Sequence, residues 1–121
     1  MYARRVDNDF EWLAVPDVAD RLGIPASRVR DLLGERVLLA VRRGENSALA
    51  IPDAFLVEVE GVLQPLATLK GTLTLLGDAG FDDDAAMEWL LSPNDELGAS
   101  PISELRLGHR SHVRRVAQAL F

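Results

Sequence analysis

The chain has 121 residues, of which 48% are hydrophobic, and a formal net charge of −6. This length allows one domain, or one small domain with an extension, and the apolar fraction suffices for a buried core. The absence of cysteine excludes a disulfide framework and any thiolate metal site.

The N-terminal residues, MYARRVDNDF, lack the apolar core of a signal peptide, and no apolar run in the sequence is long enough to span a membrane. We therefore expect a cytoplasmic protein. The mixed charge of residues 1–12 predicts an N-terminal tail, from which Phe10 and Trp12 fold back onto the core as apolar anchors.

Two short amphipathic helices are predicted directly after this tail. The first begins near Pro16, a residue favoured in the first turn of a helix, and ends at Gly23. The second runs from Ala26 to Leu33 and ends at Gly34. Their apolar stripes have helical spacing and consist of Val15, Val18, Ala19 and Leu22 in the first helix and Val29, Leu32 and Leu33 in the second.

The opposite face of the second helix is polar. At about 100° per residue, Ser27, Arg30 and Asp31 point away from the apolar stripe, and Arg28 lies on the flank. Arginine can pair with guanine through two hydrogen bonds, and serine can donate or accept one. We therefore predict a recognition helix that enters the major groove of double-stranded DNA, in which Ser27, Arg30 and Asp31 contact bases and Arg28 contacts phosphate.

A β-hairpin is predicted after the helix pair. Val37 to Arg42 and Ala48 to Ile51 are rich in strand-forming residues, and the turn residues Gly44-Glu45-Asn46-Ser47 lie between them. Arg42 and Arg43 stand just before this turn, where the tip of a wing would lie on the phosphate backbone. This arrangement predicts a winged helix-turn-helix with phosphate contacts from Arg42 and Arg43.

The stretches LAVPDVADRLGIPASRVRDLL and LLAVRRGENSALAIP, with AFL just after them, resemble the winged helix-turn-helix of the excisionase and MerR-like families. The order of parts over the whole chain is similar to a small actinobacterial family of DNA-binding regulators, in which a helical C-terminal region follows the winged domain. This resemblance implies a DNA-binding protein that acts in transcription regulation.

Charge is distributed unevenly along the chain. The segment 14–52 carries +1, the segment 53–105 carries −10, and the segment 106–121 carries +4, with four arginines and no acid. Because exposed charges are screened beyond about 8 Å at physiological salt, DNA responds to the local face that it meets. A locally basic winged face can therefore bind DNA although the whole protein is acidic. We expect its non-specific DNA binding to be weak.

The C-terminal half is predicted to be helical. A short helix from Ala54 to about Glu58, a break at Gly61 to Pro65, and a helix to about Asp78 come first. Leu66, Leu69, Leu73 and Leu76 form a narrow apolar seam, which could pack in the core or form a dimer interface.

Three further helices are expected: Asp84 to Leu91, Pro101 to Leu105 after the cap Ser100, and Ser111 to Leu120 with Leu120 on its apolar face. We interpret the run Asp82-Asp83-Asp84 as an N-terminal cap rather than a metal site, because calcium loops need more widely spaced oxygens. The arginines after Leu105 could contact phosphate, but pairing with the acidic middle helices is the favoured interpretation.

The last 33 residues carry a second resemblance. The segment WLLSPNDELGASPISELRLGHRSHVRRVAQAL is similar to the C-terminal segment of Xre/MbcA/ParS-type antitoxins, which holds a partner toxin. Those proteins have a different helix-turn-helix at the N-terminus. The resemblance implies a protein partner for the C-terminal helices.

No catalytic motif is present. His109 and His112 are the only histidines, Ser111 between them belongs to no triad pattern, and the P-loop, dinucleotide and nucleophile-elbow motifs are absent. We expect a protein that is not an enzyme and that needs no metal or other cofactor.

Together these features predict a mostly α protein with a small β-hairpin wing: a tail (1–12), a winged helix-turn-helix domain (13–60) and a C-terminal helical bundle (61–121). The expected function is DNA binding as a transcriptional regulator, in a monomer or homodimer. The alternative is a protein-interaction module, such as an antitoxin-like protein that binds its partner through the C-terminal helices.

Overall fold

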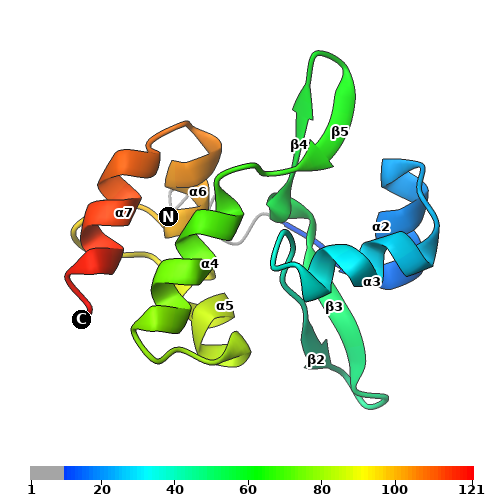
Figure 1. Ribbon diagram of the computed structural model, residues 1–121, viewed down its shortest axis with the longest axis horizontal. Coiled ribbons are helices and arrows are strands. Elements are labelled where there is room, and N and C mark those ends of the chain that lie inside the picture. Colours follow the sequence, from blue (N-terminus) through cyan, green and yellow to red (C-terminus); the bar gives the residue numbers. More distant parts are fainter. Residues whose placement is uncertain (1–9) are drawn as a thin grey trace.

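The computed structural model describes residues 10–121, and Figure 1 shows the arrangement of their helices and strands. The two predicted helices and the wing lie at one end of the described molecule, and helices α4 to α7 lie at the other. The elements are β1 (Trp12–Ala14), α2 (Val15–Leu22), α3 (Ala26–Gly34), β2 (Val41–Arg43), β3 (Ala48–Pro52), the 3-10 turn η1 (Asp53–Phe55), β4 (Leu56–Val59), β5 (Val62–Pro65), α4 (Leu69–Asp78), α5 (Asp83–Leu91), α6 (Pro101–Arg106) and α7 (Arg110–Gln118).

The wing is a three-stranded antiparallel sheet with the strand order β1–β3–β2. Leu13 pairs with Ile51, and Val41 pairs with Ala50 on the other side of β3. The predicted tail was therefore too long, because Trp12 already belongs to a strand. Trp12 packs against the core, as predicted for an apolar anchor. The Phe10 ring contacts the Trp12 ring edge to face at 5.6 Å. Residues 1–9 of the tail lie outside the described residues.

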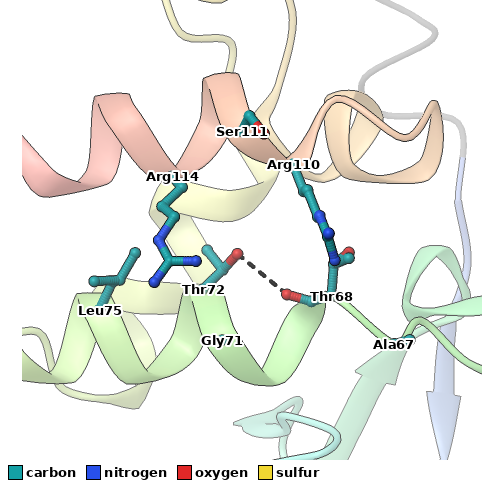
Figure 2. A pocket seen from close by; sticks show the side chains of 8 residues that line it. All are labelled: Ala67, Thr68, Gly71, Thr72, Leu75, Arg110, Ser111 and Arg114. Atoms are coloured by element: carbon teal, nitrogen blue, oxygen red, sulfur yellow. Dashed lines mark hydrogen bonds between the residues drawn. The ribbon is translucent and has the colours of Figure 1, made fainter.

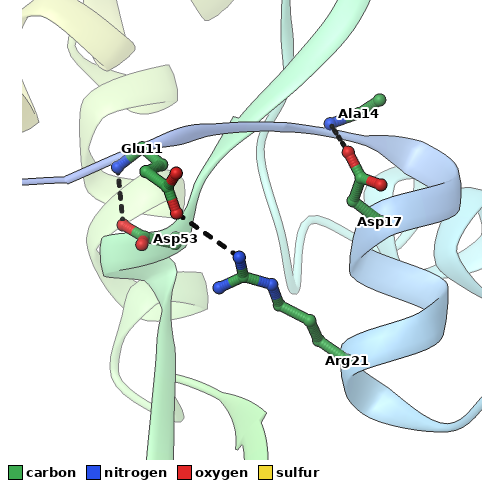
Figure 3. A network of polar contacts seen from close by, with 5 residues as sticks. All are labelled: Glu11, Ala14, Asp17, Arg21 and Asp53. Atoms are coloured by element: carbon green, nitrogen blue, oxygen red, sulfur yellow. Dashed lines mark hydrogen bonds and ion pairs between the residues drawn. The ribbon is translucent and has the colours of Figure 1, made fainter.

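Polar contacts hold β1 beside the first helix (Figure 3). The Glu11 N–H donates to Asp53 Oδ1 at 3.0 Å, and the Asp53 N–H donates to the Glu11 carbonyl at 2.8 Å. The Glu11 carboxylate lies 3.4 Å from Arg21 of α2, and Asp17 accepts from the Ala14 N–H where the strand becomes the helix. These contacts fix the start of α2 relative to β3.

The first predicted strand was placed too early. Val37 to Ala40 form no ladder in the structure, and β2 begins at Val41. Leu38 and Leu39 are buried in this connection, so their apolar character reflects core packing rather than strand pairing. The predicted turn from Gly44 to Ser47 is confirmed, and it is closed by a hydrogen bond from the Ser47 N–H to the Gly44 carbonyl.

A second hairpin replaces the predicted helix from Ala54 and the predicted break from Gly61. Asp53 starts only the single 3-10 turn η1, after which β4 and β5 pair through Val57 with Gln64 and Val59 with Val62. The β-branched Val57 and Val59 favour a strand over a helix. The hairpin projects from the body of the molecule (Figure 1), and the predicted boundary at residue 60 falls in its turn.

The four C-terminal helices occur where the sequence predicted them, with small shifts at their ends. Asp82 caps α5 by accepting from the Ala85 N–H, and Ser100 caps α6 by accepting from the Ser103 N–H. The last helix ends at Gln118, so Leu120 lies beyond it and is 40% exposed instead of lying on its apolar face.

The leucine seam belongs to the core of the chain itself. All four of its members are buried, at 7% exposure or less: Leu66, Leu69, Leu73 and Leu76. Of the two roles that the sequence left open, the structure therefore supports core packing. The C-terminal arginines correct a second interpretation, because in the described residues none of Arg106, Arg110, Arg114 or Arg115 forms an ion pair with an acid.

One of these arginines instead joins the two halves of the molecule. Arg106 of α6 donates to the carbonyl oxygens of Ala54 and Leu56, at 2.7 Å and 2.6 Å. Between these carbonyls lies Phe55, which is fully buried in the core.

Over residues 10–121, no helix combines the length and apolar character that crossing a membrane requires.

Candidate nucleic-acid interface

The helix pair meets at a turn that requires glycine. Gly23 has φ +70°, and its neighbour Ile24 donates to the Ala19 carbonyl at 3.0 Å, which closes α2 with the hydrogen bonds of a Schellman motif. Because an L side chain is strained at this φ, glycine lets the chain reverse within three residues. Ile24 packs against the core, and α3 then starts at Ala26 and crosses α2.

Helix α3 buries one face and exposes the other. Val29 is fully buried and Leu32 is 8% exposed, so this face of α3 packs in the core, and the helix contacts α2. The four residues predicted for the recognition face are all exposed: Ser27, Arg28, Arg30 and Asp31. The sequence periodicity therefore placed these side chains on the solvent face of α3.

The two arginines of α3 have different surroundings. Arg28 lies 4.0 Å from Asp31, one turn further along the helix, and 3.5 Å from Glu35, about two turns further along. Arg30 takes part in none of the ion pairs of the described residues. The Arg30 guanidinium is thus the positively charged group on this face that is available without breaking an ion pair.

The wing arginines lie within β2, and each is held by a neighbour. Arg42 donates to the Ser47 carbonyl at 2.8 Å, across the hairpin. Arg43 lies over the Trp12 ring, with its guanidinium carbon 4.1 Å from the ring centre. Successive side chains of a strand start on opposite faces, so a different neighbour holds each of the two arginines.

An ion pair that the sequence analysis missed ties α3 to the C-terminal half. Arg36, just after α3, donates to the Asp83 carboxylate of α5 at 2.6 Å. Arg36 has φ +64°, a left-handed conformation that glycine usually adopts at helix ends, and its N–H donates to the Leu33 carbonyl. No local sequence pattern indicates this ion pair, because the partner of Arg36, Asp83, is 47 residues away. The local sequence shows only that the residue two positions after Gly34 is not glycine.

The histidine segment forms no catalytic array. The Nδ1 atom of His109 lies 3.1 Å from Glu104 Oε1, and Ser111 lies in a groove between α4 and α7. Within residues 10–121, no three His, Cys, Asp or Glu side chains cluster closely enough to hold a metal ion. The arrangement that stands out is therefore the exposed polar face of α3 beside the wing.

Comparison with known proteins agrees with this layout. Residues 4–56 match the family model described as "DNA-binding protein Rv2175c, wHTH domain", and residues 66–121 match the "Rv2175c C-terminal domain of unknown function". The chain is 33% identical to the DNA-binding protein Rv2175c of Mycobacterium tuberculosis over 95% of this chain and 84% of that protein. It also matches the NMR structure of Rv2175c with a TM-score of 0.78 and 34% identity, over 93% of this chain and 82% of that one. The chain therefore belongs to the Rv2175c family, with a winged helix-turn-helix domain followed by the C-terminal domain of that family.

Proposed function

We propose that this protein binds double-stranded DNA and acts as a transcriptional regulator, with α3 in the major groove and the wing on the phosphate backbone. The observation that carries the proposal is the exposed polar face of α3 in a winged fold whose M. tuberculosis relative is named a DNA-binding protein. This role agrees with the expectation of a cytoplasmic protein. The resemblances to excisionases, MerR-like proteins and antitoxins stay expectations.

Base contacts are assigned to the part of α3 that can reach a groove floor. Arg30 is exposed and outside every ion pair of the described chain, so it can donate to guanine without a competing carboxylate. Ser27, one turn earlier on the same face, can donate or accept, and Asp31 can accept from a cytosine amino group.

Phosphate contacts are assigned to the arginines that a neighbour holds. The Ser47 carbonyl and the Trp12 ring hold Arg42 and Arg43 in place, so little side-chain freedom is lost when a phosphate arrives. Arg28 lies on the flank of α3, and on binding it would exchange its exposed ion pair with Glu35 for a phosphate. An exposed pair of this kind contributes about 0–1 kcal/mol, so this exchange costs little.

The alternative, a protein-interaction module, has less support. The leucine seam is the most regular apolar stripe in the C-terminal half, and it is buried within the chain. It therefore offers no apolar surface to a toxin or to a second copy of the protein.

Fluorescence anisotropy of labelled random duplex DNA tests the proposal. The intact protein and an Arg42→Ala/Arg43→Ala variant are titrated at about 50 and 200 mM salt, where affinity falls by about 0.9 logarithmic units per logarithmic unit of salt for each phosphate contact. The affinity of the wild type should fall steeply with salt. The affinity of the variant should fall less steeply, by the amount expected for the loss of about two phosphate contacts.

A matched control removes two exposed positive charges outside the winged domain, in Lys70→Ala/Arg115→Ala. The control should bind more like the wild type than the wing variant does. Absence of wild-type binding at low salt, or equal losses in both variants, would contradict the proposed interface.

A further inference from the structure

A groove of about 420 Å³ lies between α4 and α7, at the ends where both helices begin. We call it the α4/α7 groove, and Figure 2 shows its lining. Its polar side chains come from both helices, and glycine forms part of its floor: Thr68, Gly71, Thr72, Arg110, Ser111 and Arg114. Apart from the chain neighbours of Gly71 and the backbone of its own helix, no atom lies within 4 Å of the place where a Cβ would stand, so the space above this glycine is open.

The groove is positively charged. Arg110 and Arg114 are one helical turn apart on α7, and both side chains extend toward α4 in Figure 2. The chain has 19 acidic residues, yet neither arginine forms an ion pair within the described residues. Two guanidinium groups therefore face one cavity without an internal counter-charge.

The two helix starts add to this charge. Helices α4 and α7 have no side-chain cap and no acid in the first turn. By contrast, α5 and α6 are capped by Asp82 and Ser100, and both have acids in the first turn. The Leu69 N–H already donates to the Leu66 carbonyl at 3.1 Å, but the start of an uncapped helix still carries a partial positive charge, which favours an anion.

A buried hydroxyl points to the same conclusion independently. Oγ1 of Thr68 is buried and has no hydrogen-bond partner in the described part of the chain. The Thr68 carbonyl is already used, because it accepts from the Thr72 hydroxyl at 3.3 Å (Figure 2). Since a buried polar group without a partner destabilises a fold, an external acceptor that displaces the atoms covering the Thr68 hydroxyl would satisfy a group that the chain leaves unpaired.

We propose that the α4/α7 groove binds a phosphate group, with Arg110 and Arg114 paired to its oxygens and the Thr68 hydroxyl donating to it. A phosphate offers at least one more acceptor oxygen than a carboxylate, which suits two guanidinium groups, a hydroxyl and helix N–H groups together. The phosphate can belong to a small phosphorylated molecule or to the backbone of DNA. The site is separate from α3 and stands whether or not α3 binds DNA.

NMR titration of the full ¹⁵N-labelled chain with inorganic phosphate, at constant ionic strength against acetate, tests the proposal. The amide signals of Gly71 and Ser111 should shift and saturate with phosphate but not with acetate. Arg110→Ala/Arg114→Ala should weaken this binding by about tenfold or more, the usual effect of losing charge-assisted hydrogen bonds. Arg115→Ala is the matched control, because Arg115 is the next arginine on α7 and lies outside the groove.

Thr68→Val distinguishes a ligand contact from a structural role. The substitution removes the unpartnered hydroxyl with little change in shape, so the thermal midpoint should hold or rise while phosphate binding weakens. Shifts that do not saturate, or an equal loss of binding in Arg115→Ala, would overturn the proposal.

Duplex DNA as a second titrant identifies the source of the phosphate. If DNA shifts the same amides and the double variant abolishes those shifts, the groove holds a backbone phosphate. If only inorganic phosphate shifts them, the ligand is a small phosphorylated molecule. If DNA fails to bind at all while phosphate saturates the groove, the proposed function fails and the phosphate site stands.

Discussion

The guanidinium carbon of Arg43 lies over the indole of Trp12, 4.1 Å from the ring centre. The two residues come from β2 and β1, the outer strands on either side of β3. This contact joins the two outer strands of the wing and holds the side chain of one wing arginine.

The contact between Trp12 and Arg43 predicts a measurable coupling. In a double-mutant cycle of Trp12→Leu and Arg43→Ala, chemical denaturation should give a coupling of about 0.5–1 kcal/mol, the usual value for an exposed cation–π pair. A parallel cycle of Trp12→Leu with Arg42→Ala should give a value near zero, because Arg42 bonds the Ser47 carbonyl instead. Equal coupling in both cycles would rule out a specific stacking contribution.

The left-handed backbone at Arg36 predicts an order of stability among three proteins. Arg36→Gly removes the conformational cost of φ +64° and also an exposed ion pair worth about 0–1 kcal/mol, so its unfolding free energy should stay near that of the wild type. Arg36→Ala loses the ion pair and keeps the unfavourable φ, so it should be about 1 kcal/mol less stable than Arg36→Gly. Thermal melts of the three proteins check this order, and an alanine variant as stable as the glycine variant would contradict it.

The buried leucine seam predicts a loss of stability that does not depend on protein concentration. Leu73 is 1% exposed, and truncation to Ala should cost about 2–5 kcal/mol. Leu107→Ala serves as the control, since Leu107 is 67% exposed and its loss should change stability by no more than about 0.5 kcal/mol. A midpoint of unfolding that rises with protein concentration would instead indicate that the seam contributes to a dimer.

The free guanidinium of Arg30 predicts a loss of sequence preference. Once a preferred site has been selected from random duplexes, Arg30→Ala should weaken binding to that site by about 1–3 kcal/mol and change binding to random DNA much less. Arg28→Ala, by contrast, should weaken both about equally, as expected for a phosphate contact. For each variant, competition titrations measure the affinity for the selected site relative to random DNA. An equal loss of affinity for both DNAs in Arg30→Ala would contradict a base contact from Arg30.

Much of the winged half could be predicted from local sequence. Gly23 and the helical spacing of Val18 and Val29 specify the helix pair, because turn chemistry and periodicity act over only a few residues. The turn from Gly44 to Ser47 and the cap at Ser100 were predictable for the same reason.

The errors have a common physical cause. Pro52-Asp53 is a sound start signal for a helix, but Val57 and Val59 pair with β5 as soon as a hairpin becomes available. Trp12 enters a strand only because β3, about 40 residues later, offers it a partner. Arg106 was expected near acidic side chains and instead bonds two carbonyl oxygens about 50 residues earlier in the chain. Such long-range partners are not encoded in any local pattern.

The bonds from Arg106 to the carbonyls of Ala54 and Leu56 have a consequence for how the molecule can be divided. A fragment that ended after β5 would lose the guanidinium from both carbonyls and the helix α6 that packs beside η1. We therefore expect the winged domain and the C-terminal helices to unfold as one cooperative unit, although two separate family models match them. We accordingly expect no easily cleaved linker between β5 and α4, and the smallest fragment expected to fold runs from β1 to α7.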